Sequence, residues 1–289
     1  MKTRISILLH QFLLSYLIVL TESSIDGVGD RCQLPSSLST SCTCISNYLQ
    51  CTGINSTLIL QSIQRHEART ITQVEILNSD LKCLDFGHFS SFEFVKVIKV
   101  KYSGLVKLFC DHGAATEAVQ KLTYLTNLDL SHNQLTHIDK TWTLLSQLHH
   151  LNISHNRLHS ARPVFSSFHQ LTSLDLSHNR LSASLDRAVL DQIPVTISRL
   201  DISHNPWPCL PSLAWVYTWS LTLSIPVQES MSHAMCRIVN SPSHQLAPLL
   251  TVMQYYKLKV VTEYKILNCN KILIRIFSLC TWLYSSNHK

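Results

Sequence analysis

Hydrophobic and polar residues alternate in a pattern that recurs along the middle of the chain about every 23 residues. In each 11-residue copy, positions 1, 4 and 6 are apolar, position 9 is asparagine or serine, and position 11 is leucine or tryptophan. The alternation within a copy predicts one short strand, after which the chain turns back towards the next copy. The copies occupy residues 71–81, 95–105, 125–135, 148–158, 171–181 and 197–207.

The pattern predicts that these copies stack. One coil cannot bury its apolar face alone, so successive coils pack on one another and their strands form a parallel sheet. Positions 4 and 6 then make inward columns, while the asparagine amides of position 9 satisfy backbone groups that the turn leaves unpaired. The expected asparagine ladder comprises Asn133, Asn156, Asn179 and Asn205. Three aromatic residues lie six residues before the next copy, and we expect them to fill the core: Phe89, Trp142 and Phe165.

The copies resemble the leucine-rich repeat family, whose motif is L-x-x-L-x-L-x-x-N-x-L. The last four copies all carry Ser-His-Asn at positions 7 to 9, which makes the resemblance specific. It implies an α/β fold, a leucine-rich-repeat solenoid of about six repeats over residues 71–207. Such a solenoid is a curved right-handed superhelix with a parallel β-sheet on its concave face and disulfide caps at its ends.

Four cysteines precede the repeats with the spacing C-x9-C-x-C-x6-C. Taken alone, they allow three pairings. The spacing is similar to the N-terminal cysteine cap of extracellular leucine-rich repeat proteins. That resemblance implies a cap over residues 32–60, with Cys32 paired to Cys44 and Cys42 paired to Cys51.

The sequence N-P-W-P-C at residues 205–209 is similar to the start of the family's C-terminal cap, which continues as a short amphipathic helix. We expect this cap over residues 205–253. The family usually has a second cysteine where this chain has Pro211, so the resemblance leaves one bridge, from Cys209 to Cys236. Cys83 and Cys110 follow the first two strands, and adjacent coils are expected to bring them together. The alternative is two free buried thiols.

The N-terminus indicates export. Residues 1–23 have a basic start, an apolar segment and small residues at the end, as a cleaved signal peptide does. An uncleaved anchor is the alternative, but the apolar segment is shorter than the roughly 20 residues of a membrane span. All 10 cysteines follow it, and in an oxidising compartment they should pair. Glycosylation sequons start at Asn55 and Asn152.

The tail, residues 254–289, follows neither the repeat nor the cap. Its apolar stretch, 272–284, is short for a membrane span and contains Arg275, which is costly inside a bilayer. This favours an interfacial or core-packed segment over a span, and it leaves open an association with a membrane through the tail. Cys269 and Cys280 are candidates for a bridge within it.

Composition and charge exclude two classes of protein. With 45% apolar and 15% charged residues, the chain differs from disordered proteins. Its net charge is +6, but residues 24–253 contain 16 basic and 16 acidic side chains. A neutral body argues against a nucleic-acid partner, which needs a basic face.

No catalytic, metal-binding or cofactor-binding motif is found in the sequence. His66-Glu67 begins like a zinc-protease motif, but threonine occupies position 70, and the nucleophile-elbow and phosphate-loop motifs do not occur. Histidines share position 8 in the last four copies and should stack as a column, yet a straight column does not converge on a metal as zinc ligands do. These are His132, His155, His178 and His204. We therefore predict a protein without catalysis, metal or cofactor.

The remaining candidate is the concave sheet face, onto which positions 3, 5 and 7 point. Position 5 is mostly acidic, with one basic interruption, Lys99, beside Lys101 at position 7, which suits a protein partner of complementary charge. The predicted partner-binding residues are Glu75, Lys99, Lys101, Asn127, Asp129, His150, Asp175, Arg199 and Asp201. The alternative is a solvated face without a ligand, and a glycan on Asn152 would obstruct this face.

The resemblance implies a secreted protein for extracellular protein–protein recognition, in adhesion, matrix association or ligand sensing. Its partner would be an extracellular protein ligand or receptor. One alternative is the ectodomain of a membrane-anchored receptor at the cell surface. A less favoured one is an extracellular hydrolase with the repeats as a scaffold. The fold hosts all of these roles and does not choose among them.

Overall fold

The computed structural model describes residues 32–110, 117–138, 140–159, 165–182, 193–211, 233–238, 246–249 and 251–255. The predicted signal peptide, nearly all of the tail, Cys269 and Cys280 lie outside the described residues, as does the segment after Pro211 for which the resemblance implies a helix. Among the described residues, no helix has the length and apolar character that crossing a membrane requires.

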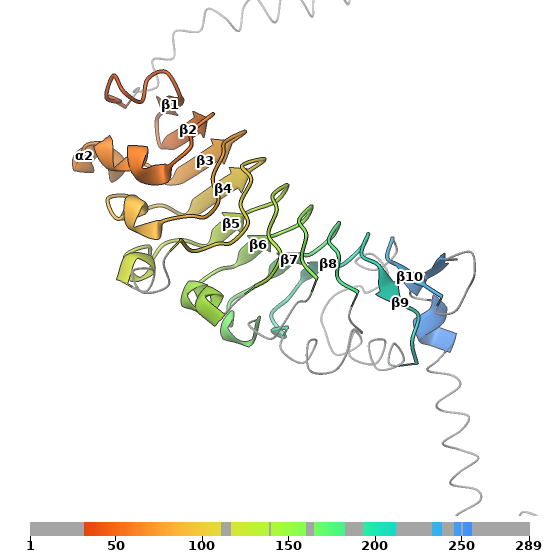
Figure 1. Ribbon diagram of the computed structural model, residues 1–289. Coiled ribbons are helices and arrows are strands. Elements are labelled where there is room, and N and C mark those ends of the chain that lie inside the picture. The colour runs from red at the N-terminus through yellow and green to blue at the C-terminus, as the bar shows by residue number, and fades with distance from the viewer. Residues whose placement is uncertain are drawn as a thin grey trace, which may run out of the picture.

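Eight strands lie side by side in chain order along an arc (Figure 1). β1 and β2 are antiparallel, and each later pair of neighbours is parallel. The strands are β1 (Cys42–Ile45), β2 (Tyr48–Thr52), β3 (Gln73–Leu77), β4 (Val97–Lys101), β5 (Asn127–Asp129), β6 (His150–Asn152), β7 (Ser173–Asp175) and β8 (Arg199–Asp201). Each copy of the motif contributes one strand, β3 to β8, and the predicted solenoid with a parallel sheet is confirmed.

The strand register brings equivalent positions of neighbouring copies together. Val74 pairs with Ile98, and Ile98 pairs with Leu128, so the two weaker copies share the register of the later ones. This inward column is at most 1% exposed and comprises Val74, Ile98, Leu128, Leu151, Leu174 and Leu200. Burying each such side chain stabilises the fold by about 1.5–3 kcal/mol.

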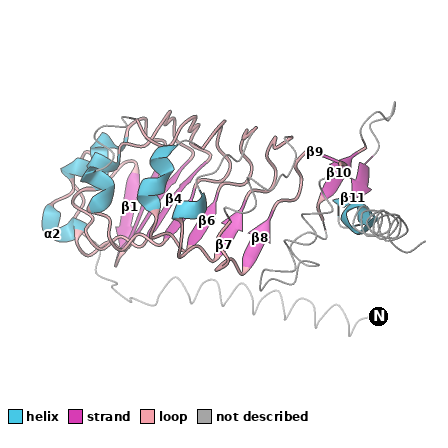
Figure 2. Ribbon diagram, turned by 90° about the horizontal axis from the view of Figure 1, so that it is seen from below, coloured by secondary structure: helices cyan, strands magenta, loops and turns pink. Residues whose placement is uncertain are grey.

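The return segments contain short helices, which Figure 2 shows beside the strands. They are η2 (Thr57–Ser62), α2 (Arg65–Ala68), η3 (Phe86–Phe89), η4 (Lys140–Leu145) and η5 (Phe165–Ser167). The predicted core aromatics Phe89, Trp142 and Phe165 lie in η3, η4 and η5, and all three are fully buried. Apolar side chains of the short helices therefore close the core on the side opposite the sheet.

The asparagine ladder forms the turn after each later strand. Asn156 shows the arrangement: its Oδ1 accepts from the Leu135 amide at 2.9 Å, and its Nδ2 donates to three carbonyl oxygens. The acceptors are the carbonyls of Leu130, Ile153 and Ser154, at 3.0–3.1 Å. Because two of these partners belong to the preceding coil, the amide ties neighbouring coils together while it satisfies buried backbone groups.

The N-terminal cap joins the sheet. Cys32 is bonded to Cys44 and Cys42 to Cys51, the pairing implied by the resemblance, and the first pair has its Cα atoms 5.5 Å apart. The cap folds as the β1–β2 hairpin, and β2 pairs in parallel with β3. The concave sheet is therefore two strands longer than the six repeats alone predict.

A second, smaller sheet lies at the other end of the repeats. It contains β9 (Trp207–Pro208), β10 (Met235–Arg237) and β11 (Leu246–Pro248), with β10 in the middle. Cys209 and Cys236 are bonded, and Trp207 is 4% exposed with its Nε1 donating to the Ile202 carbonyl at 2.9 Å. This tryptophan occupies position 11 of the last copy and closes the core there.

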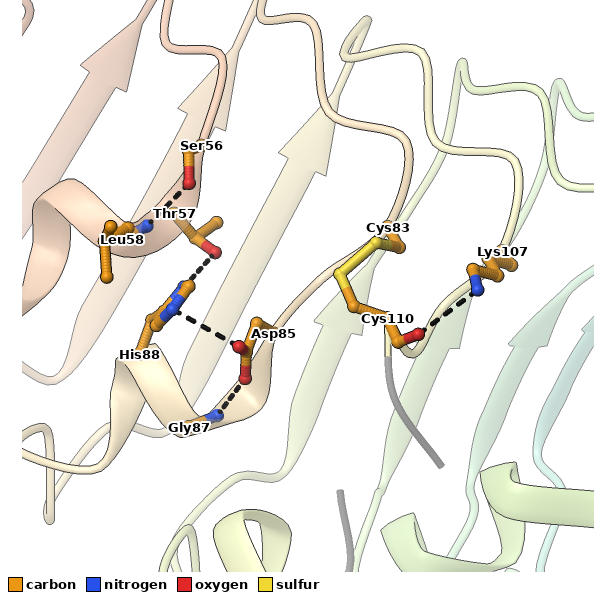
Figure 3. The surroundings of a disulfide bond; sticks show 9 residues. All are labelled: Ser56, Thr57, Leu58, Cys83, Asp85, Gly87, His88, Lys107 and Cys110. Atoms are coloured by element: carbon orange, nitrogen blue, oxygen red, sulfur yellow. Dashed lines mark hydrogen bonds and ion pairs between the residues drawn. A yellow bond between two sulfur atoms is a disulfide. The ribbon is translucent and has the colours of Figure 1, made fainter. Parts of the chain in front are cut away.

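Cys83 and Cys110 are also bonded, with their Cα atoms 5.0 Å apart. Figure 3 shows this bridge between the coils of β3 and β4, where the Lys107 ammonium donates to the Cys110 carbonyl oxygen. In the adjacent η3 helix, His88 contacts the Thr57 hydroxyl at 2.8 Å and the Asp85 carboxylate at 3.2 Å. The disulfide thus joins the first two repeats beyond the strand pairing, and the contact of His88 with Thr57 joins the first repeat to the η2 segment that precedes it.

Candidate protein-binding face

The concave face of the sheet contains a shallow hollow of about 230 Å³ over strands β4 to β8. Seven of the nine predicted partner-binding residues line it: Lys99, Asn127, Asp129, His150, Asp175, Arg199 and Asp201. They come together because the strands are parallel and in register, so that positions 3 and 5 of successive copies form neighbouring rows. The other two predicted residues, Glu75 and Lys101, lie outside the lining.

The acidic row at position 5 has a structural task that sequence reasoning missed. Oδ1 of Asp129, Asp175 and Asp201 each accepts from the amide of the serine two residues later, at 2.9–3.0 Å. Asn152 does the same with Ser154. The carboxylates therefore hold the end of each strand through one oxygen. The side-chain oxygen of Asn152 makes the same hydrogen bond in its own turn.

Charges on the face are only partly paired. Lys101 on β4 forms an ion pair with Asp129 on β5 at 2.9 Å, and both side chains are mostly buried. In the described part of the chain, the side chains of Lys99 and Arg199 form no hydrogen bond or ion pair. Among the described residues that line the hollow, the unpaired cations are therefore Lys99 on β4 and Arg199 on β8. The carboxylate of Asp175 lies between these strands on β7, and that of Asp201 is on the same strand as Arg199.

Glu75 lies on the same face but is tied to the cap. Its carboxylate accepts hydrogen bonds from the Tyr48 hydroxyl and, at 3.1 Å, from the Gln50 amide. Burial, together with the bond to Glu75, raises the pKa of the Tyr48 hydroxyl to about 12. Tyr48 and Gln50 extend the face beyond the repeats, and the alternation Tyr48-Leu49-Gln50-Cys51 is the sequence signal that would have revealed them.

A second feature borders the face at the end of the strands. Rings at position 8 stack in a row, which we call the histidine ridge: Tyr102, His132, His155, His178 and His204. Successive ring centroids are 4.4, 4.1, 4.0 and 4.0 Å apart. Each of these residues has a φ of 52° to 57°, a left-handed conformation that is uncommon for residues other than glycine.

The ridge geometry does not form a metal centre. Nearly parallel rings direct their nitrogen lone pairs alongside one another, whereas a metal needs ligands that converge. Among the described residues, no group of three or more histidine, cysteine, aspartate or glutamate side chains is placed to hold a metal ion.

Comparison with known proteins agrees with this architecture. The leucine rich repeat family model matches residues 123–181, which contain β5, β6 and β7 with their return segments. The chain contains leucine-rich repeats. No curated protein matches its sequence.

Among solved structures, the chain is similar to human 5T4, also called Wnt-activated inhibitory factor 1 and trophoblast glycoprotein. The match covers 76% of this chain and 97% of that chain, with a TM-score of 0.50 and 17% sequence identity. At this identity the likeness concerns the fold alone.

Proposed function

We propose that this leucine-rich repeat protein works outside the cell as a non-catalytic recognition module that binds a protein partner on its concave face. The observation that carries the proposal is the hollow of about 230 Å³, which is lined by the cations Lys99 and Arg199 and by the carboxylates of Asp129, Asp175 and Asp201. Ordered charges of both signs favour a partner with the complementary arrangement over nonspecific adsorption.

The disulfides support the extracellular location. Four bridges lie within the described residues, and such bonds persist in oxidising compartments. Together with the expected signal peptide, they favour a secreted protein, with a cell-surface ectodomain as the alternative. The hydrolase alternative has weaker support, because the sequence contains no nucleophile-elbow motif and the carboxylates of Asp175 and Asp201 accept serine amides in turns.

We expect the protein in the culture medium when the whole chain is expressed in secretory cells with a C-terminal tag. Its mass should be lower by the signal peptide, because residues 1–23 are expected to be cleaved. Tagged protein that stays in the membrane pellet after alkaline washing would instead support the anchored alternative.

Neutralising the free charges of the hollow should weaken partner binding. In the variant D175N/D201N/R199Q, each new asparagine keeps the Oδ1 acceptor of the turn, as Asn152 does in the native chain. We expect binding to fall at least about tenfold, with the melting temperature changed by at most about 2 °C. The measurement is binding of the purified protein to an array of extracellular domains, followed by titration of each hit.

The matched control is E117Q/K121Q, which removes an exposed i,i+4 ion pair away from the sheet. It should bind as the native protein does. Equal loss in both variants, or no loss in the concave-face variant, would contradict the proposed role of the hollow.

The proposed function also predicts the pattern of glycosylation. Asn152 lines the hollow, whereas Asn55 is exposed in the loop before η2. Because a glycan on Asn152 would occupy the binding face, we expect Asn55 to carry the glycan and Asn152 to be unmodified. Enzymatic deglycosylation should therefore shift the mass of N152Q but not that of N55Q. If deglycosylation shifts the mass of the native protein but not that of N152Q, Asn152 carries the glycan. The partner would then have to bind outside the hollow.

A further inference from the structure

The histidine ridge is separate from the hollow and presents its rings to solvent. His155, His178 and His204 are exposed, and the side chain of Tyr102 at the end of the row is also largely accessible. The rings succeed one another at about 4 Å along the solenoid axis. Once protonated, they would make a straight row of closely spaced cations.

Further cations accompany this row. Arg157 and Arg180 follow the ridge by two residues in consecutive coils, and both are exposed. In the described part of the chain, their side chains have no hydrogen-bond or ion-pair partner. The segments that form the ridge and its turns, 102–107, 131–138, 154–159, 177–182 and 203–206, contain no aspartate or glutamate. The ionisable side chains of these segments are therefore histidine, arginine, lysine and tyrosine, and none of them is a carboxylate.

The nearest carboxylates are those of position 5. Asp175 and Asp201 act on the ridge electrostatically, and both already accept serine amides. The other titratable groups facing the central rings are the neighbouring ridge histidines. Lowering the pH would thus add positive charges to the row of rings, and the two carboxylates would neutralise these charges only in part.

We propose that the histidine ridge is an acid-dependent binding site for an extended polyanion, specifically a sulfated polysaccharide chain. Sulfate esters stay ionised throughout the range in which imidazole titrates, so the protein alone sets the pH of binding. A linear chain also matches a linear row of charges, and its anions relieve the repulsion between neighbouring imidazolium rings. The proposal goes beyond the concave-face function and depends on different residues.

The direction of the pH effect follows from the surroundings of the rings. Burial in the stack, then the charge of neighbouring histidines, lowers the pKa of His155 and His178 below the usual value. The native rings therefore favour the neutral form, and protonation destabilises the fold as the pH falls below about 6.5. A polyanion that binds the protonated row raises these pKa values in return, so binding and proton uptake are coupled.

Heparin is the probe for the test, in titrations at pH 7.4, 6.5 and 5.5 and at constant ionic strength. We expect affinity to rise at least about tenfold from pH 7.4 to 5.5, as binding becomes coupled to protonation of several rings. Heparin should also raise the melting temperature at pH 5.5 and leave it nearly unchanged at pH 7.4.

The structure supplies a conservative variant. Asn78 occupies position 8 in the first copy with a φ of 48°, so asparagine accepts the left-handed conformation of the ridge. H155N/H178N/H204N should fold and lose the pH dependence of heparin binding. H150N, which removes a histidine of the concave face, should keep it. If the triple variant is too unstable to purify, the single variant H178N replaces it. The histidine pKa values of the native protein, measured by NMR with and without heparin, give a further test that needs no variant.

Three results would overturn the proposal. These are heparin binding that does not change with pH, pH dependence that survives in the ridge variant, and ridge pKa values that heparin leaves in place. Polyglutamate that binds as tightly as heparin at the same charge concentration would overturn the assignment to a sulfated polysaccharide. The variant K99Q/R199Q removes the unpaired cations of the hollow and leaves the ridge and its neighbouring carboxylates in place. It should keep the pH dependence of heparin binding, so failure here is distinguishable from failure of the concave-face function.

Discussion

Replacing Asn156 with leucine is expected to destabilise the protein by about 4 kcal/mol, one of the largest losses from a single substitution. Leucine has nearly the same size but cannot hydrogen bond. It would leave the buried Leu135 amide without its acceptor. It would also remove one of the two asparagine donors from each of the Leu130 and Ile153 carbonyls, which keep only those of Asn133 and Asn179. Chemical denaturation measures the loss, and thermal melting should show a fall of roughly 10 °C.

The control is Asn127→Leu, the same chemical change on the concave face. Asn127 is half-buried, and its Oδ1 accepts only from the neighbouring Thr126 hydroxyl at 2.9 Å. We expect a loss of about 0.5 kcal/mol or less. If the two variants lose similar stability, the ladder does not hold the coils together in the way that its hydrogen bonds indicate.

Removing the bridge between β1 and β2 should have a comparably large effect. In C42S/C51S, the buried Cys42 and Cys51 become two hydroxyl groups inside the cap, at the end of the hydrophobic core. Loss of a native disulfide typically costs about 2–5 kcal/mol. We expect little secreted protein, and limited proteolysis of what is recovered should cut first within residues 32–60.

The matched comparison is C83S/C110S. Chain entropy alone predicts the larger loss here, because this bridge closes 27 residues against 9 in the cap. We expect the smaller loss, since the Leu84–Phe109 bridge of the backbone and the buried Phe109 hold the same two segments together. Better secretion of C42S/C51S than of C83S/C110S would contradict the structural importance of the cap.

The repeats themselves are predictable from sequence because each position has one physical task. Leucine at position 4 and asparagine at position 9 recur with a fixed period, and both are buried as that period requires. Even the weaker copies could be placed, since Val74 and Ile98 keep the apolar position although serine replaces asparagine. Periodicity is therefore sufficient for the fold.

Details that depend on contacts between different elements were not predictable in the same way. The cysteine spacing implies the covalent cap, but the entry of β2 into the sheet depends on Tyr48 and Gln50 reaching Glu75. The ion pair between Lys101 and Asp129 crosses from position 7 of one copy to position 5 of the next, a diagonal that no repeat pattern specifies. Such contacts require the twist and spacing of the finished sheet.

The candidate site was predicted in outline. The charges of the hollow could be assigned from strand alternation, yet the role of Asp175 in its turn and the left-handed backbone of His178 could not. Histidine adopts a positive φ more often than most residues but far less often than glycine, so its presence alone does not indicate one. Asn78 at the same position of the first copy was the available hint, because asparagine accepts this conformation more readily than most residues.

Covalent labelling of carboxylates, read by mass spectrometry, tests most directly whether a protein partner occupies the concave face. The protein would be labelled alone and in complex with a partner obtained from the array. We predict that the partner protects Asp175 and Asp201 and leaves the labelling of Glu117, an exposed residue outside the hollow, unchanged. Protection of Glu117 with unaltered labelling of Asp175 and Asp201 would contradict the account and place recognition elsewhere on the solenoid.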